Sequence, residues 1–128
     1  MESIISVLNA IHCSAINKIN IDLLKKEVTF DLSLVDNGKV SNHELKFINC
    51  ISFLWLEKDN HVHESYDFSK YDYYELTSVN LRSISATSDD IWLKQYPMEY
   101  NVAVEIWETA LLINAGELLI DQQHFPII

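Results

Sequence analysis

The residues best suited to metal chemistry lie in one short stretch, which contains Asp59, His61, His63 and Glu64. Imidazole and carboxylate groups are common ligands of transition metals, and an extended segment would place His61 and His63 on one face. A metal site needs three or four such groups, held in place by further hydrogen bonds. No comparable pair of ligands lies elsewhere in the sequence. We therefore expect a solvated loop with no metal and no cofactor.

Nucleophilic catalysis would require a serine or cysteine beside a positioned base. The sequence has no Gly-x-Ser-x-Gly turn, and Cys50 lies inside an apolar run rather than at an exposed helix start. With 2 glycines in 128 residues, the glycine-rich phosphate loops of nucleotide enzymes cannot be built. The prediction is a protein that is not an enzyme. A small ligand-binding domain or enzyme is the alternative.

The charge balance narrows the class of partner. The chain has 9 Lys+Arg against 19 Asp+Glu, a formal net charge of −10 at pH 7. Phosphate backbones and anionic lipids repel such a protein, so we expect neither nucleic acid nor a membrane as partner. The N-terminus carries Glu2 where a signal peptide needs basic residues, and both Cys13 and Cys50 stand in apolar settings. A cytoplasmic protein with two buried free thiols is expected.

Charge and aromatic rings are concentrated between residues 57 and 75. Here carboxylates outnumber lysines and are interleaved with tyrosine and phenylalanine. Rings supply buried area at a contact, while acidic groups steer a basic partner and pair with its Arg or Lys. The plainer alternative is an acidic surface that only maintains solubility. We predict a protein-binding surface made by Glu57, Asp59, Glu64, Tyr66, Asp67, Phe68, Tyr71, Asp72, Tyr73 and Glu75.

The elements that would position this surface begin with a helix. The length suits a single domain, 1–128, and 48% hydrophobic residues suffice for one core. Residues 2–13 place Ile4, Leu8 and Ile11 on one face at helical spacing, with His12 expected to be half-buried and hydrogen-bonded.

Alternation with a period of two, beginning near Ile16, then predicts two strands, the second over residues 28–34, joined by Leu24-Lys25-Lys26. The sequence Asp36-Asn37-Gly38 tolerates positive φ and predicts a hairpin connection. The next strand is expected from near Glu44 to Leu56, central and covered on both faces because residues 48–56 are apolar at both parities. Residues 57–74 follow as a long loop, and alternation resumes in a strand from Tyr74 to about Ser85.

The last third of the chain leaves two possibilities open. Residues 87–93 predict a capped helical turn. Residues 101–120 predict a strand, a second strand and a turn into a last strand, with one helix over 102–119 as the rival. The expected fold is α+β, with a mostly antiparallel, curved sheet of about six strands and the N-terminal helix packed on one face.

This layout resembles the small cytosolic immunity proteins of bacterial polymorphic-toxin and contact-dependent inhibition loci. The similar features are the leading helix, the strand over 43–51, the acidic aromatic loop running into 74–79, and the closing apolar segment 110–115. The resemblance implies an inhibitor that binds a cognate toxin domain, often a basic nuclease whose cleft acidic groups occlude. It carries over no catalytic residue.

Overall fold

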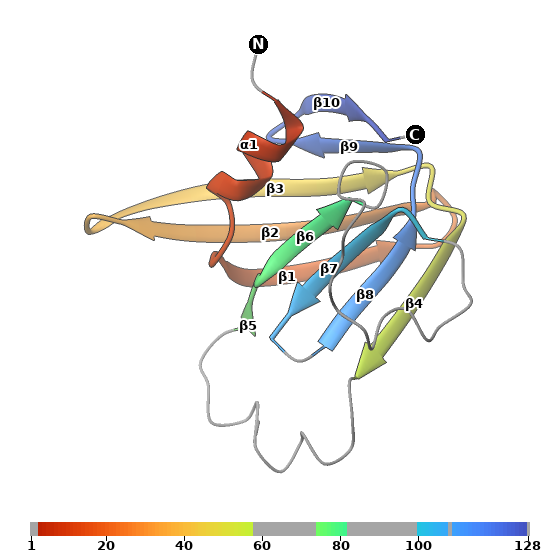
Figure 1. The fold of residues 1–128 in the computed structure, drawn as a ribbon, viewed down its shortest axis with the longest axis horizontal. Helices are drawn as coiled ribbons and strands as arrows, with labels where there is room; N and C mark the ends of the chain where they lie inside the picture. The colour runs from red at the N-terminus through yellow and green to blue at the C-terminus, as the bar shows by residue number, and fades with distance from the viewer. Residues whose placement is uncertain (1–2, 58–73, 82–99, 108, 128) are drawn as a thin grey trace.

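The computed structural model describes residues 3–57, 74–81, 100–107 and 109–127. In these residues one helix precedes ten strands (Figure 1). The elements are α1 (Ile4–Ala10), β1 (Ala15–Asp22), β2 (Glu27–Asp36), β3 (Lys39–Ile48), β4 (Ser52–Glu57), β5 (Tyr74–Glu75), β6 (Ser78–Leu81), β7 (Val102–Ile106), β8 (Thr109–Asn114), β9 (Glu117–Ile120) and β10 (Gln123–Pro126).

The described strands form two antiparallel sheets. One has six strands in the order β10-β9-β3-β2-β1-β5, and the other has four in the order β4-β8-β7-β6. Figure 1 shows the strands of the smaller sheet running across those of the larger one. The prediction of a mostly antiparallel fold with one short N-terminal helix is confirmed. The prediction of one sheet is wrong, because the chain changes sheets after β3, β4, β5 and β8.

The long strand predicted from Glu44 to Leu56 is two strands in different sheets. At Asn49 the backbone takes a left-handed φ of 54°, which asparagine tolerates better than most residues. The Cys50 N–H then donates to the Lys26 carbonyl at 2.9 Å, and the Ile51 N–H donates to the Asn114 carbonyl at 2.9 Å. These two bonds lead the chain from one sheet to the other. The second strand, β4, is at the edge of its sheet rather than central.

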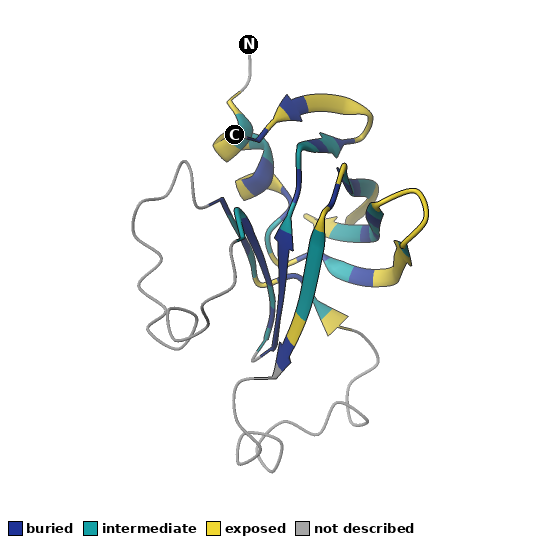
Figure 2. Ribbon diagram, turned by 90° about the vertical axis from the view of Figure 1, so that its right-hand side faces the viewer, coloured by how far each residue is buried: buried dark blue, intermediate teal, exposed yellow. Residues whose placement is uncertain are grey.

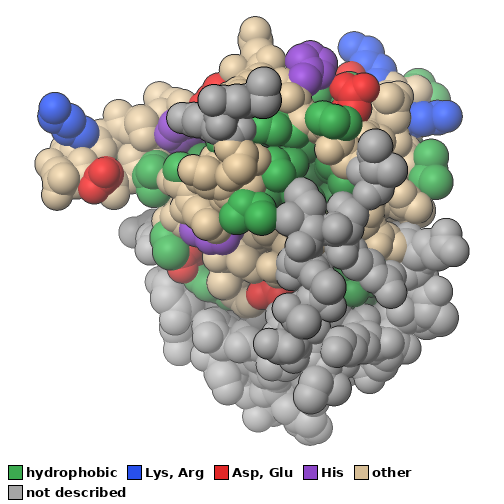
Figure 3. Space-filling view, turned by 45° about the horizontal axis from the view of Figure 1, so that its top comes forward, with side chains coloured by type: hydrophobic (Ala, Val, Ile, Leu, Met, Phe, Trp, Pro, Cys, Tyr) green, Lys and Arg blue, Asp and Glu red, His purple; other side chains and the backbone are tan. Residues whose placement is uncertain are grey.

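The hairpin between β2 and β3 is confirmed, and it is longer than predicted. Asn37 and Gly38 both have positive φ, 51° and 79°, as a two-residue type I′ turn requires. Asp36 pairs with Lys39, so β3 begins at Lys39 and not at Glu44. Residues 34–41 extend beyond the pairing of β1 with β2 and of β9 with β3. They form an arm that projects from the side of the molecule (Figures 1 and 3).

The main core lies between the two sheets. Phe30 and Phe47 are fully buried and meet edge to face, with ring centroids 6.2 Å apart. Apolar residues of β7 and β8 supply the other side, and Figure 2 shows the buried positions running along these strands. Strand β8 is buried on both faces, because a second cluster made by Leu56, Ala103, Ala110 and Leu112 lies on the opposite side of this sheet.

Helix α1 closes the core where the two sheets meet. Ser3 caps it by accepting a hydrogen bond from the Ser6 N–H at 3.1 Å, and a left-handed Cys13 (φ 69°) follows it. The helix is therefore shorter than the predicted 2–13. Leu8 and Ile11 enter the main core. No helix in the described part of the chain is long and apolar enough to cross a membrane.

The described part of residues 101–120 forms three strands, β7, β8 and β9, as predicted, and the rival helix over 102–119 is wrong. Trp107 has a φ of 53° and turns the chain between β7 and β8. The Asn101 side chain joins the far ends of these strands, donating to the Ala115 carbonyl at 2.7 Å and accepting from the Ala115 N–H at 2.9 Å. Strand β10 is an addition that the sequence did not predict. The helical turn predicted at 87–93 lies outside the described residues.

Candidate functional site

Of the ten residues predicted to bind a partner, the structure describes two. Glu75 lies in β5, and the backbone of Glu57 ends β4. The other eight, Asp59, Glu64, Tyr66, Asp67, Phe68, Tyr71, Asp72 and Tyr73, lie outside the described residues, as do His61 and His63. The described part of the predicted surface therefore consists of its two ends.

Both ends of the acidic aromatic stretch lie beside the β7–β8 turn. Glu57 pairs with Thr109, the first residue of β8. On the other side, the Thr77 hydroxyl accepts a hydrogen bond from the Trp107 N–H at 2.8 Å, and the Thr77 N–H donates to the Glu105 carbonyl at 2.8 Å. The chain thus leaves and re-enters the sheets at the same end of the molecule (Figure 1).

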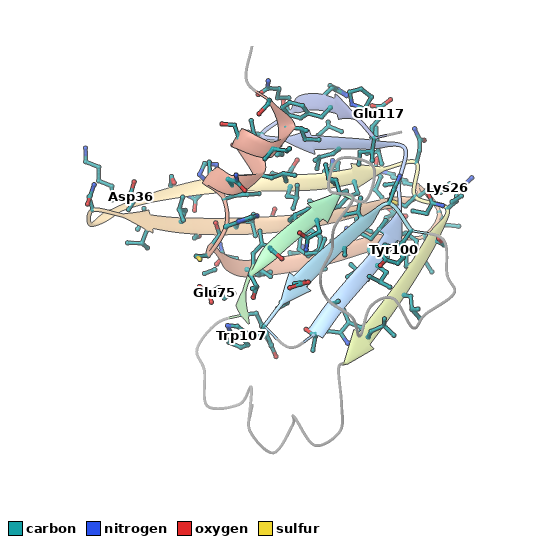
Figure 4. The ribbon with its side chains drawn as sticks, viewed as in Figure 1. Lys26, Asp36, Glu75, Tyr100, Trp107 and Glu117 are labelled. Atoms are coloured by element: carbon teal, nitrogen blue, oxygen red, sulfur yellow. The ribbon has the colours of Figure 1, made fainter. Side chains whose placement is uncertain are left out.

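A small aromatic and acidic group marks this end, and we call it the Trp107 cluster: Tyr74, Glu75, Thr77 and Trp107. The indole N–H of Trp107 donates to Glu75 Oε2 at 3.2 Å. The rings of Tyr74 and Trp107 are tilted by 43° with centroids 6.0 Å apart, a separation typical of favourable aromatic pairs. Figure 4 shows Glu75 and Trp107 together at this end.

The Trp107 cluster combines an exposed aromatic ring with side chains that are already held in place, and both properties favour binding to another protein. Tyr74 is 49% exposed, so a partner can bury the remainder of its ring. Trp55 of β4, two residues before Glu57, is also 49% exposed. Because hydrogen bonds to Trp107 fix both Glu75 and Thr77, little conformational entropy would be lost when a partner binds them.

The sequence pattern predicted Glu75 as a site residue but not Trp107. The signal was weak, because Trp107 stands in an alternating run where it would be taken for a strand residue. Its role depends on a left-handed turn and on a partner 32 positions earlier in the chain.

A second polar arrangement joins Ser41, His43 and Asp121, and we call it the His43 relay. The Ser41 hydroxyl lies 2.9 Å from His43 Nε2. His43 Nδ1 lies 2.8 Å from Asp121 Oδ2. Asp121 Oδ1 accepts from the Glu44 N–H at 2.8 Å, and the Asp121 N–H donates to the Glu44 carbonyl at 2.9 Å. These four hydrogen bonds connect Asp121, in the β9–β10 turn, to His43 and Glu44 of β3, and His43 to Ser41 of the same strand.

A cavity of about 280 Å³ adjoins two residues of this relay, His43 and Asp121. It lies between α1, β3 and the β9–β10 turn. Val7, Ala10, Ile11 and Ile120 supply apolar parts of its lining, and Ser6, His43, Asp121 and Gln123 supply polar ones.

The sequence pattern did not predict the His43 relay. Ser41 and His43 stand two positions apart and share one face of a strand, but the strand was expected to begin after them. Asp121 lies 78 positions from His43, and no local pattern connects them.

His12, Cys13 and Cys50 belong to neither the Trp107 cluster nor the His43 relay. His12 is half-buried, its Nε2 accepts from the Val79 N–H at 3.5 Å, and burial lowers its pKa. The prediction for His12 is therefore confirmed. Cys50 is buried, whereas Cys13 is exposed, in the turn after α1. The prediction that both thiols are buried is wrong for Cys13. Among the described residues, no three His, Cys, Asp or Glu side chains are grouped to hold a metal.

The two thiols should differ sharply in reactivity. Burial raises the pKa of the Cys50 thiol to about 11, so at pH 8 only about one molecule in a thousand carries its thiolate. We expect iodoacetamide to modify Cys13 in the native protein and to modify Cys50 only after unfolding in urea, as measured by mass spectrometry. A Cys13→Ser variant is the control and should remain unmodified until unfolded. Equal rates at the two thiols would contradict the burial of Cys50.

A comparison with known protein families assigns the chain to one of them. The sequence profile of the YxiG-like proteins matches residues 4–125, from the start of α1 into β10. The chain belongs to the YxiG-like family. No curated protein matches its sequence. The match covers the helix, strands β1 to β9 and β10 as far as Phe125, so the Trp107 cluster and the His43 relay both lie within the matched region.

Proposed function

We propose that this protein is a cytoplasmic immunity protein that binds and neutralises a basic toxin domain, such as a nuclease. The observation that carries the proposal is the placement of the two ends of the acidic aromatic stretch. Its two ends flank one turn, and the Trp107 cluster at that turn displays the same combination of ring and carboxylate. A contact surface at one end of the molecule is supported by this convergence.

The charge of the chain favours a basic partner. With a net charge of −10, the protein raises the association rate of a cationic domain and repels nucleic acid that would compete for the same cleft. Charge alone supplies little affinity at an exposed rim. The exposed rings of Tyr74 and Trp55 are suited to the apolar centre of the contact.

The test takes as candidate partner any basic toxin domain encoded next to the gene for this protein. We expect the purified protein to bind this domain, to abolish its activity at a one-to-one ratio, and not to bind lysozyme, a basic protein that is not cognate. Tyr74→Ala should weaken binding. Val40→Ala is the matched control, because Val40 is also exposed, at 65%, but lies on the projecting arm. Equal binding to lysozyme and to the toxin domain would contradict the proposal.

A further inference from the structure

We propose that Ser41, His43 and Asp121 form a hydrolytic site for small esters, with Ser41 as nucleophile, His43 as general base and Asp121 as a positioning residue. This activity is independent of toxin binding. The two distances that define such a relay, 2.9 Å from Ser41 Oγ to His43 Nε2 and 2.8 Å from His43 Nδ1 to Asp121 Oδ2, both lie in hydrogen-bonding range. Serine, histidine and aspartate acting together are recognised by this geometry and not by their order in the sequence.

Strand β3 and two hydrogen bonds to Glu44 fix the positions of the relay residues. Ser41 and His43 share a face of β3 with Leu45 and Phe47, which are fully buried. Asp121 has a left-handed φ of 50°, and its backbone N–H and Oδ1 are both bonded to Glu44. Its Oδ2 therefore faces His43 Nδ1. A carboxylate can only accept, so a neutral His43 carries its proton on Nδ1 and presents the Nε2 lone pair to Ser41.

The adjoining cavity indicates the substrate class. At about 280 Å³ it is slightly smaller than the usual range of ligand pockets. Its apolar residues, Val7, Ala10, Ile11 and Ile120, suit a short acyl chain. Ser6 and Gln123 in the same lining carry side-chain hydrogen-bond donors.

The reaction balances without a cofactor. Ser41 Oγ attacks the ester carbonyl carbon while its proton passes to His43 Nε2, and a tetrahedral oxyanion forms. The carbon–oxygen bond to the alcohol breaks, and His43 returns the proton to the departing alcohol. A water molecule then attacks the acyl-serine, with His43 again taking and returning one proton. The products are the carboxylic acid and free Ser41.

Exposure limits the rate of this reaction. The side chains of His43 and Asp121 are 24% and 49% exposed, so water screens the charge pair that would stabilise the imidazolium. Activated acyl and phosphonyl reagents are therefore the suitable probes.

The test uses a fluorophosphonate. Ser41 Oγ would form a bond to phosphorus, the phosphorus–fluorine bond would break, and the proton would leave Ser41 through His43. We expect stoichiometric labelling of the native protein at Ser41, located by peptide mass spectrometry, and hydrolysis of p-nitrophenyl acetate that Ser41→Ala abolishes. Ser33→Ala is the matched control, because Ser33 is a serine on the same hairpin that bonds to Asn17 and Asn42 instead of a histidine.

Asp121→Asn separates positioning from folding. Asparagine tolerates the left-handed backbone and can still accept from Glu44, but its amide donates to His43 Nδ1 and moves the histidine proton to Nε2. We expect this variant to keep its melting temperature and to lose labelling rate about 100-fold. The proposal is overturned if Ser41 is no more reactive than Ser33, or if Asp121→Asn labels at the parental rate.

Discussion

Replacing Phe47 with alanine is expected to lower the free energy of unfolding by about 3–5 kcal/mol. Phe47 is fully buried and meets the ring of Phe30 edge to face. It pairs with Val28 on one neighbouring strand and Leu118 on the other, both of which are also fully buried. The close packing around the site leaves the lost ring as a cavity and removes its transfer free energy.

Urea unfolding followed by circular dichroism measures this change. Val40→Ala is the control on the same strand, because Val40 is 65% exposed on the arm; its effect should stay within about 0.5 kcal/mol. If Phe47→Ala does not fold at all, the free energy of unfolding can be measured for Phe47→Leu instead, because this substitution removes less side-chain volume. A loss of under about 1 kcal/mol for Phe47→Ala would contradict the position of Phe47 at the centre of the core.

Truncating Tyr71 or Tyr73 to alanine is expected to raise the dissociation rate of the toxin domain about 30-fold, which corresponds to about 2 kcal/mol. The reason is that a ring at the desolvated centre of an interface affects how long the complex lasts, and not how often the partners meet. Surface plasmon resonance against the immobilised toxin domain measures both rates.

Carboxylates at the rim should act on the other rate. We expect Asp59→Ala and Asp67→Ala to slow association and to reduce its dependence on salt concentration, with little change in dissociation. Measurements at two ionic strengths separate these effects. If all four variants bind and protect like the parent, the predicted surface is wrong, and the acidic residues after Lys94 become the next candidate.

The features that the sequence by itself determined are those that follow from local conformational preference. Asn37 and Gly38 accept positive φ, and the hairpin between β2 and β3 follows from them. Alternation along residues 28–32 separated the buried positions of β2 from the half-buried ones. The apolar spacing of the first residues identified the helix. Each of these signals depends on neighbours within a few positions, so no knowledge of distant contacts is needed.

The tertiary structure alone decided how the strands are divided and which side chains meet. Nothing local shows that the chain leaves one sheet at Asn49 and joins another at Ser52, because apolar residues continue at both parities through the break. The Trp107 cluster and the His43 relay each join segments 30 or more positions apart. Alternation shows which face of a strand is buried, but not which strand lies beside it, because partners are chosen by burying both sheets together.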